Sequence, residues 1–110
     1  MDNTFNLYIA FVQFTDKHAG KTRPILIVRR SGNDFNYFPI TSQYERKSLR
    51  IKQKYYRIID WKQAGLNKQS YVDTNNLFSV PAYLIESKSP IGNLSDNDRE
   101  SLLLFLQQKE

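Results

Sequence analysis

The sequence predicts a mainly β fold with helices, a small and mostly antiparallel barrel or half-barrel on which one C-terminal helix packs. Short apolar segments rich in β-branched and aromatic residues recur along the chain, separated by polar segments that carry glycine or proline. Only the segment after Ser95 repeats its apolar residues at helical spacing. A length of 110 residues suits one domain, so we expect a single domain over residues 1–110.

Three strands are predicted in the first part of the chain. Leu7–Phe14 is apolar and aromatic and is expected to be a buried strand, followed by a polar loop at Thr15–Thr22. Pro24–Val28 is the second strand, with its proline at the start, where a missing N–H matters least. Ser31–Asp34 contains turn residues, and Phe35–Thr41 is the third strand. The second and third strands are therefore expected to form a hairpin.

The middle of the chain predicts shorter elements. Leu49–Lys52 alternates apolar and basic residues and is interpreted as a short strand, and Tyr56–Ile59 is a further strand. Trp61–Gly65 ends in glycine and is expected to be a turn, and Gln69–Val72 is expected to be extended. Leu77–Ile85 is predicted as a strand with an internal proline, which assigns it to an edge or a bulge.

The C-terminal segment predicts a helix that begins after Ser95. Asp98 follows Ser95 at the spacing of a capping box, with aspartate in place of the usual glutamate. Acidic residues in the first turn also suit the positive end of the helix dipole. The apolar face expected to dock on the sheet consists of Leu102, Leu103, Phe105 and Leu106.

Composition excludes several classes of function. The chain has no cysteine and a single histidine, so disulfides, thiolate nucleophiles and paired-histidine zinc sites are ruled out. Its uncharged apolar runs, such as Leu102–Leu106, are far shorter than the roughly 20 residues that cross a bilayer. The N-terminal residues do not have the pattern of a secretory signal. We therefore expect a cytoplasmic protein that binds no metal, no other cofactor and no membrane.

One segment concentrates the positive charge. The formal net charge is +5, and the segment from Arg46 to Arg57 has no acidic residue and includes Tyr55 and Tyr56. Cations interleaved with aromatic rings suit single-stranded RNA, because cations meet phosphates and rings stack on bases. The plainer interpretation is a solvated segment that only confers solubility. The basic residues of this segment are Arg46, Lys47, Arg50, Lys52, Lys54 and Arg57.

RNA cleavage is a reaction that these residue types allow. RNA carries its own nucleophile, the 2′-hydroxyl, so an enzyme needs only to align it with phosphorus and stabilise the negative charge that develops. Arginine suits the second task, since its planar fork donates two parallel hydrogen bonds to phosphate oxygens.

Four segments resemble, in order, motifs of the MazF/PemK toxins of bacterial toxin–antitoxin systems. Lys21–Val28 (KTRPILIV) is similar to the family's G-x-R-P-V-L-V-(I/V) strand, and Pro39–Gln43 (PITSQ) to its I-T-(S/A)-Q signature. Leu66–Val72 (LNKQSYV) resembles G-L-x-x-(D/Q)-S-x-(V/I), and Gly92–Ser95 (GNLS) opens a segment similar to G-x-L-(S/T)-x-x-(D/E). The resemblance covers about residues 8 to 106.

The sequence departs from the family pattern at two places. Phe5–Tyr8 stands where the family has R-G-(D/E)-(V/I), and the Thr15–Thr22 loop is shorter than in many members. The first departure affects any contact that the opening residues make in the family. The second alters a loop expected to border the substrate groove, and with it the cleavage specificity.

The resemblance implies an SH3-like half-barrel that forms a homodimer. It implies a metal-independent, sequence-selective endoribonuclease that cuts single-stranded RNA by 2′-hydroxyl attack. It also implies a cognate antitoxin whose acidic tail occupies the RNA groove.

Two residues match the family's catalytic positions. Arg23 matches the catalytic arginine and would stabilise the transition state at the scissile phosphate. A guanidinium is a poor general base, so charge stabilisation is its expected role. Thr41 matches the catalytic Ser/Thr and would hydrogen-bond a phosphate oxygen. The plainer interpretations are a strand-end arginine in a surface salt bridge and a β-branched strand residue.

Further residues are candidates for RNA contact or support of the site. Ser42 and Gln43 would contact phosphate or a base edge, and Ser70 matches a family position that supports the site or the dimer. His18 is a candidate acid or base, or simply an exposed loop histidine. Asp16 is a weaker candidate and more simply a turn former. Tyr55 and the six basic residues would bind the RNA backbone or the antitoxin tail.

Three alternatives stay open. The CcdB toxins share the architecture but poison gyrase by protein contact. A small basic barrel would bind RNA without cutting it. A degenerate member of the family would have lost the activity.

Overall fold

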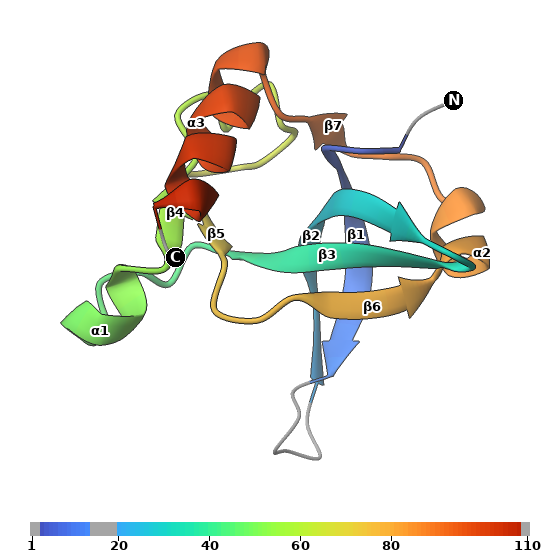
Figure 1. Cartoon of the computed structure of the whole chain (residues 1–110), viewed down its shortest axis with the longest axis horizontal. Helices are drawn as coiled ribbons and strands as arrows, with labels where there is room; N and C mark the ends of the chain where they lie inside the picture. Colours follow the sequence, from blue (N-terminus) through green and yellow to red (C-terminus); the bar gives the residue numbers. More distant parts are fainter. Residues whose placement is uncertain (1–2, 14–19, 109–110) are drawn as a thin grey trace.

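The structure is a computed structural model, and it describes residues 3–13 and 20–108. The described strands form one curled, antiparallel half-barrel sheet of seven strands in the order β4-β5-β3-β2-β1-β7, with β6 paired to β3 (Figure 1). The strands are β1 (Asn6–Gln13), β2 (Gly20–Ser31), β3 (Asp34–Thr41), β4 (Tyr55–Arg57), β5 (Tyr71–Asp73), β6 (Phe78–Pro81) and β7 (Gly92–Asn93). The helices are α1 (Leu49–Lys52), α2 (Ala82–Glu86) and α3 (Asp96–Gln107).

The predicted hairpin of the second and third strands is confirmed. β2 and β3 pair from Ser31↔Asp34 to Ile25↔Pro39, with a register shift between Ile27 and Arg29. Gly32 in the turn has φ +61°, a left-handed conformation that glycine adopts without strain. The strand at the N-terminus, β1, pairs with β2 along the other edge, from Leu7↔Leu26 to Gln13↔Gly20.

The strand β3 changes partners along its length. Its first half pairs with β2 on one side and β6 on the other, whereas Ile40 and Thr41 pair with Val72 and Tyr71 of β5. The pairing of β2 with β3 stops at Ile25↔Pro39. The next rung would involve Pro24, which has no N–H to donate. Beyond that rung β2 stays with β1 while β3 continues with β5, so the sheet curls and a gap opens between β2 and β3.

Two predicted strands are wrong in part. The alternating segment Leu49–Lys52 is the short helix α1, because the Ser48 side chain accepts a hydrogen bond from the Ile51 N–H and caps it. Both apolar residues of α1, Leu49 and Ile51, are exposed, so no sheet face required an extended segment. The alternation was therefore a misleading signal.

The segment predicted as a strand at Leu77–Ile85 contains a strand only as far as Pro81. From there it turns into α2, with Pro81 at the N-cap, where its fixed φ fits the start of a helix. Ala82 and Ile85, three residues apart, are both buried, as one face of a helix requires.

The other elements differ from prediction mainly at their ends. Of the predicted loop at Thr15–Thr22, the part from Gly20 onward belongs to β2, and the rest lies outside the described residues. In the predicted first strand Leu7 and Tyr8 are buried, whereas Phe11 is 65% exposed. Trp61–Gly65 is a turn as expected. The predicted strand at Tyr56–Ile59 is β4, which starts one residue earlier and ends at Arg57.

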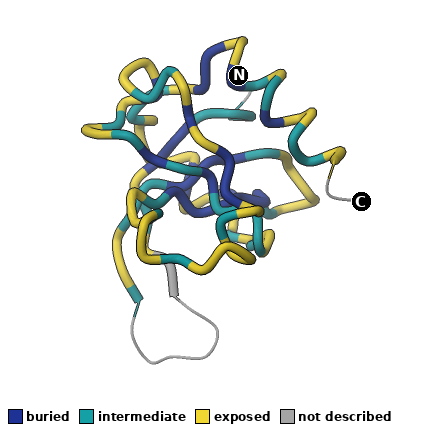
Figure 2. Tube along the Cα trace, turned by 90° about the vertical axis from the view of Figure 1, so that its left-hand side faces the viewer, coloured by how far each residue is buried: buried dark blue, intermediate teal, exposed yellow. Residues whose placement is uncertain are grey.

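The core consists of two clusters. One cluster, around Leu26, Tyr56 and Ile58, includes Leu102 of α3. The other, around Ile25, Ile27 and Phe35, includes two residues of α2. Figure 2 shows the buried residues running through the centre of the fold. Within the described part of the chain, no helix is long and apolar enough to span a membrane.

The helix α3 packs on the sheet as predicted, but through a narrower face. Leu102 is fully buried, and the ring of Phe105 meets that of Tyr56 edge to face at 5.8 Å between centroids. Leu103, predicted to dock, is 48% exposed, because the buried face is narrower than the apolar run. Trp61 is half-buried and packs against the same core cluster.

The cap of α3 forms as predicted at Ser95 but not at Asp98. The Ser95 hydroxyl accepts a hydrogen bond from the Asp98 N–H at 3.1 Å. The Asp98 carboxylate does not face solvent at the helix end: it is fully buried and accepts hydrogen bonds from the Tyr56 hydroxyl and from the Ile59 and Asp60 N–H groups.

Candidate functional site

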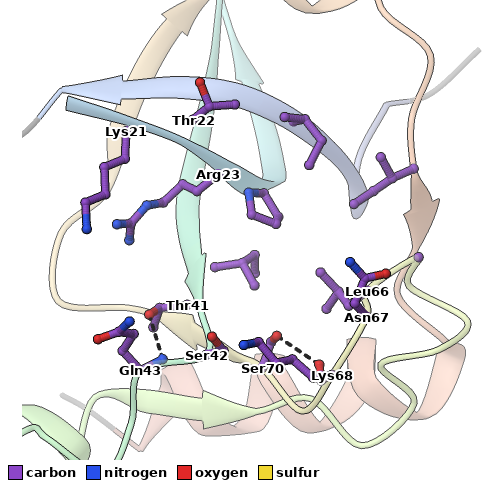
Figure 3. A pocket seen from close by; sticks show the side chains of 15 residues that line it. Lys21, Thr22, Arg23, Thr41, Ser42, Gln43, Leu66, Asn67, Lys68 and Ser70 are labelled. Atoms are coloured by element: carbon purple, nitrogen blue, oxygen red, sulfur yellow. Dashed lines mark hydrogen bonds between the residues drawn. The ribbon is translucent and has the colours of Figure 1, made fainter.

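A pocket of about 310 Å³ opens where β2 and β3 separate, and it is lined by both Arg23 and Thr41 (Figure 3). β2 forms one wall and the end of β3 another, and residues 65–70, which lead into β5, complete the lining. The remaining lining residues are Ile9, Lys21, Thr22, Pro24, Ile40, Ser42, Gln43, Gly65, Leu66, Asn67, Lys68, Ser70 and Ile91.

The pocket is cationic. Its lining includes Lys21, Arg23 and Lys68, and none of the described residues that line it is acidic. Figure 3 shows the Lys21 and Arg23 side chains directed across the pocket toward Thr41 and Gln43. Three cations in the lining of one pocket attract an anion such as a phosphodiester.

The arginine is held by its strand. Arg23 is half-buried and pairs with Ala10 of β1, so its backbone is fixed while its side chain reaches the pocket. Its charge also acts on Tyr55: burial, and next the Asp73 carboxylate, raise the pKa of that phenol, while Arg23 opposes the rise. The Arg23 charge is therefore near enough to act on Tyr55 as well as on the pocket.

The threonine hydroxyl is positioned by the backbone that follows it. Thr41 Oγ1 accepts a hydrogen bond of 3.0 Å from the Gln43 N–H, which fixes the end of β3 in a tight turn. A hydroxyl that accepts in this way still carries a hydrogen to donate, and a phosphate oxygen is a suitable acceptor. Ser42 and Gln43, predicted as neighbouring contacts, are exposed and line the same pocket.

Ser70, predicted to support the site or the dimer, lies in the wall of the pocket. Ser70 is buried, and its hydroxyl donates a 3.0 Å hydrogen bond to the Lys68 carbonyl. The Gln69 side chain donates at 2.8 Å to the Ile58 carbonyl. These bonds hold residues 68–70 in place at the pocket wall.

The basic segment predicted to bind RNA does not line the pocket. It leaves the pocket after Gln43 and forms α1 and β4. Within it, Lys52 Nζ lies 4.7 Å from the ring centroid of Tyr44 and 3.8 Å from the Glu45 carboxylate. The exposed members are Arg46, Arg50, Lys54 and Arg57, and the half-buried ones are Lys47 and Lys52.

The tyrosine of that segment is not a surface platform. Tyr55 is buried at 8% exposure, beside Tyr44 and Tyr71 in an aromatic cluster. Tyr44 stacks on Tyr71 with centroids 4.2 Å apart. Since a buried ring cannot stack on a base, Tyr55 has a packing role in this cluster.

Sequence reasoning missed four residues with polar side chains that line the pocket: Lys21, Thr22, Asn67 and Lys68. A signal existed for Lys21, because residues two apart on a strand share a face and Arg23 was already assigned. Asn67 and Lys68 come from a loop whose approach to β2 depends on tertiary packing. The predicted candidates His18 and Asp16 lie outside the described residues.

Comparison of the chain with protein-family models and with curated proteins found no match. Among residues 3–13 and 20–108, no three His, Asp or Glu side chains gather as a metal site would require. The pocket and its side chains are therefore the features of this chain that point to a function.

Proposed function

We propose that this protein is the toxin of a toxin–antitoxin system, a metal-independent endoribonuclease that cleaves single-stranded RNA in the pocket between β2 and β3. One observation carries the proposal: Arg23 and Thr41 line the same pocket from two different strands. The curled half-barrel supports a finer assignment to the SH3-like fold of the MazF/PemK toxins.

The chemistry uses a nucleophile that the substrate supplies. The 2′-oxygen of one nucleotide attacks the adjacent phosphorus, and the bond from phosphorus to the 5′-oxygen breaks. The 2′-hydroxyl loses a proton and the leaving 5′-oxygen gains one, so the products are a 2′,3′-cyclic phosphate and a 5′-hydroxyl. Arg23 stabilises the negative charge that builds on the phosphate oxygens, and Thr41 donates a hydrogen bond to one of them.

Charge supports the proposed partners. Lys21, Arg23 and Lys68 give the pocket the sign that an RNA backbone requires, and the chain as a whole carries +5. The same charge suits an acidic antitoxin segment that competes for the pocket. We propose in addition that the toxin acts as a homodimer.

The experiment that tests the activity uses the purified protein and a long single-stranded RNA in the presence of EDTA. We expect new 5′ ends at a restricted set of short sequences, each with a 5′-hydroxyl and a partner fragment ending in a cyclic phosphate. Intact RNA after prolonged incubation would contradict the proposal. Gyrase inhibition without RNA cleavage would favour the CcdB-like alternative, and RNA binding without cleavage a non-catalytic barrel.

A further inference from the structure

The pocket has two chemically different parts. One part contains the Arg23 guanidinium, the Lys21 amine and the Thr41 hydroxyl. The other is apolar. Its residues are Ile9, Pro24, Ile40, Leu66 and Ile91, which come from β1, β2, β3 and two connecting segments. The cleavage chemistry accounts for the first part only.

The side chain of Asn67 is the polar group that accompanies the apolar part. Asn67 lines the pocket and is exposed, and its amide makes no hydrogen bond to any other described residue. Figure 3 shows this amide next to Leu66, across the pocket from Lys21 and Arg23. An amide presents one acceptor and two donors side by side, which is the pattern that pairs with the edge of a nucleobase.

The wall that carries Asn67 is fixed before any ligand arrives. The Gly65 N–H donates to the Lys62 carbonyl at 3.0 Å, and the Leu66 N–H donates to the Trp61 carbonyl at 3.0 Å. A Cβ on Gly65 would lie 2.0 Å from the Ile91 carbonyl oxygen, so the two segments are in direct backbone contact. On the other side of Asn67, the bond from Ser70 to the Lys68 carbonyl holds the chain. The backbone on either side of Asn67 is therefore already ordered, so binding has to fix only the Asn67 side chain, which limits the entropy lost.

We propose that the apolar part of the pocket holds the nucleobase next to the scissile phosphate, and that Asn67 selects which base is accepted. This inference rests on the proposed function. The apolar side chains contact the faces of the base, and the Asn67 amide hydrogen-bonds its edge. Asn67 is therefore a specificity-determining residue, distinct from Arg23 and Thr41, which act on the phosphate. A base lacking the matching donor and acceptor leaves the amide unpaired and binds less well.

The test measures binding, so that it does not depend on cleavage. Four short single-stranded oligonucleotides that differ only in the central base are made with 2′-O-methyl groups, which block attack by the 2′-oxygen. Their affinities for the wild type, Asn67→Ala and Asn67→Asp are measured by fluorescence anisotropy. Asn76→Ala is the matched control, since Asn76 is also exposed but does not line the pocket.

We expect the wild type and Asn76→Ala to prefer the same base by about fivefold or more over the poorest one. Asn67→Ala should reduce this preference to less than about twofold, and Asn67→Asp should change the order, since a carboxylate accepts but does not donate. A wild type without base preference, or an unchanged order in both Asn67 variants, would overturn the inference.

Cleavage of a long RNA, assayed separately, keeps this inference apart from the proposed function. If the wild type cuts RNA and the Asn67 variants keep the binding order, the base assignment fails while the nuclease stands. If the wild type binds with an Asn67-dependent base preference yet cuts nothing, the nuclease fails while the base site stands.

Discussion

Arg23 of β2 and Thr41 of β3 would face each other two rungs beyond Ile25↔Pro39, had the ladder of these strands continued. The ladder ends at that pair, and the next rung would involve Pro24, which has no N–H to donate. Both side chains line the pocket that lies between the two strands, so a guanidinium and a hydroxyl reach it from different strands.

Replacing the Thr41 hydroxyl tests its role in the proposed reaction. Thr41→Val keeps the shape of the side chain but removes the donor, so we expect the cleavage rate to fall by about 10²-fold. Thr41→Ser retains the hydroxyl and should stay within severalfold of the wild type. Rates come from single-turnover cleavage of a short RNA in EDTA. Equal rates for the valine and serine variants would remove Thr41 from the mechanism.

Lys21, one of the two lysines among the described residues that line the pocket, should contribute one phosphate contact. For single strands the logarithm of the binding constant falls with that of salt by about 0.7 per phosphate contact. Lys21→Ala should therefore make the slope shallower by about 0.7. Lys88→Ala, an exposed lysine outside the pocket, should leave the slope unchanged. Titrations of a 2′-O-methyl oligonucleotide at several salt concentrations decide this, and identical slopes for the two variants would contradict the contact.

The bond from Tyr56 to Asp98 should make stability depend on alkaline pH. The hydroxyl donates to the buried carboxylate at 2.5 Å. Burial and this bond raise the pKa of Tyr56 well above its ordinary value of 10.0. Above about pH 10 the unfolded tyrosine ionises while the folded one keeps its proton, so this contribution to stability is complete below pH 10 and is lost as the pH rises further.

Tyr56→Phe removes both the bond and the titration. At pH 7 we expect its free energy of unfolding to be lower than that of the wild type by about 1–3 kcal/mol, since one buried acceptor loses its donor. The difference should shrink in urea unfolding at pH 11. If the difference in free energy of unfolding between the wild type and Tyr56→Phe stays constant or widens with pH, Tyr56 does not keep its proton in the folded protein.

The backbone contact behind the apolar part of the pocket predicts unequal effects of two glycine substitutions. Gly32 and Gly65 both have positive φ, of +61° and +87°. A Cβ on Gly32 meets nothing within 4 Å, so Gly32→Ala should cost only the left-handed strain of about 1–2 kcal/mol. Gly65→Ala adds a clash with the Ile91 carbonyl and should cost more than about 3 kcal/mol. Thermal unfolding of the two variants gives the comparison, and equal losses would refute the contact.

Local signals in the sequence predicted much of the fold. The turn at Ser31–Asp34 and the cap at Ser95 depend on residues a few positions apart, so both could be identified from the sequence. The strand predicted at Leu49–Lys52 was wrong, because an alternation of apolar and basic residues over only four positions is compatible with both a strand and a capped helical turn. Asp98 was interpreted as a capping-box residue in the first turn of the helix. Its buried bonds were not foreseen, because its partners, Tyr56 and the 59–60 backbone, are distant in sequence.

The candidate site was predictable only in part. Arg23 and Thr41 came from a resemblance of motifs, and their common pocket depends on the partner change of β3, for which Pro24 and Pro39 were the visible signals. Asn67 and Lys68 lie on a loop whose position is fixed by contact with the segment at Ile91. No local pattern encodes that contact.

The most direct test of the central claim compares Arg23→Ala with the wild type on single-stranded RNA in EDTA. Arg30→Ala serves as the control, since Arg30 lies on the same strand, outside the pocket, in an exposed ion pair with Glu86. We expect the cleavage rate of Arg23→Ala to fall by about 10²-fold or more, with an unchanged unfolding midpoint, while Arg30→Ala cuts normally. An Arg23→Ala protein that cuts RNA at the wild-type rate would contradict the account.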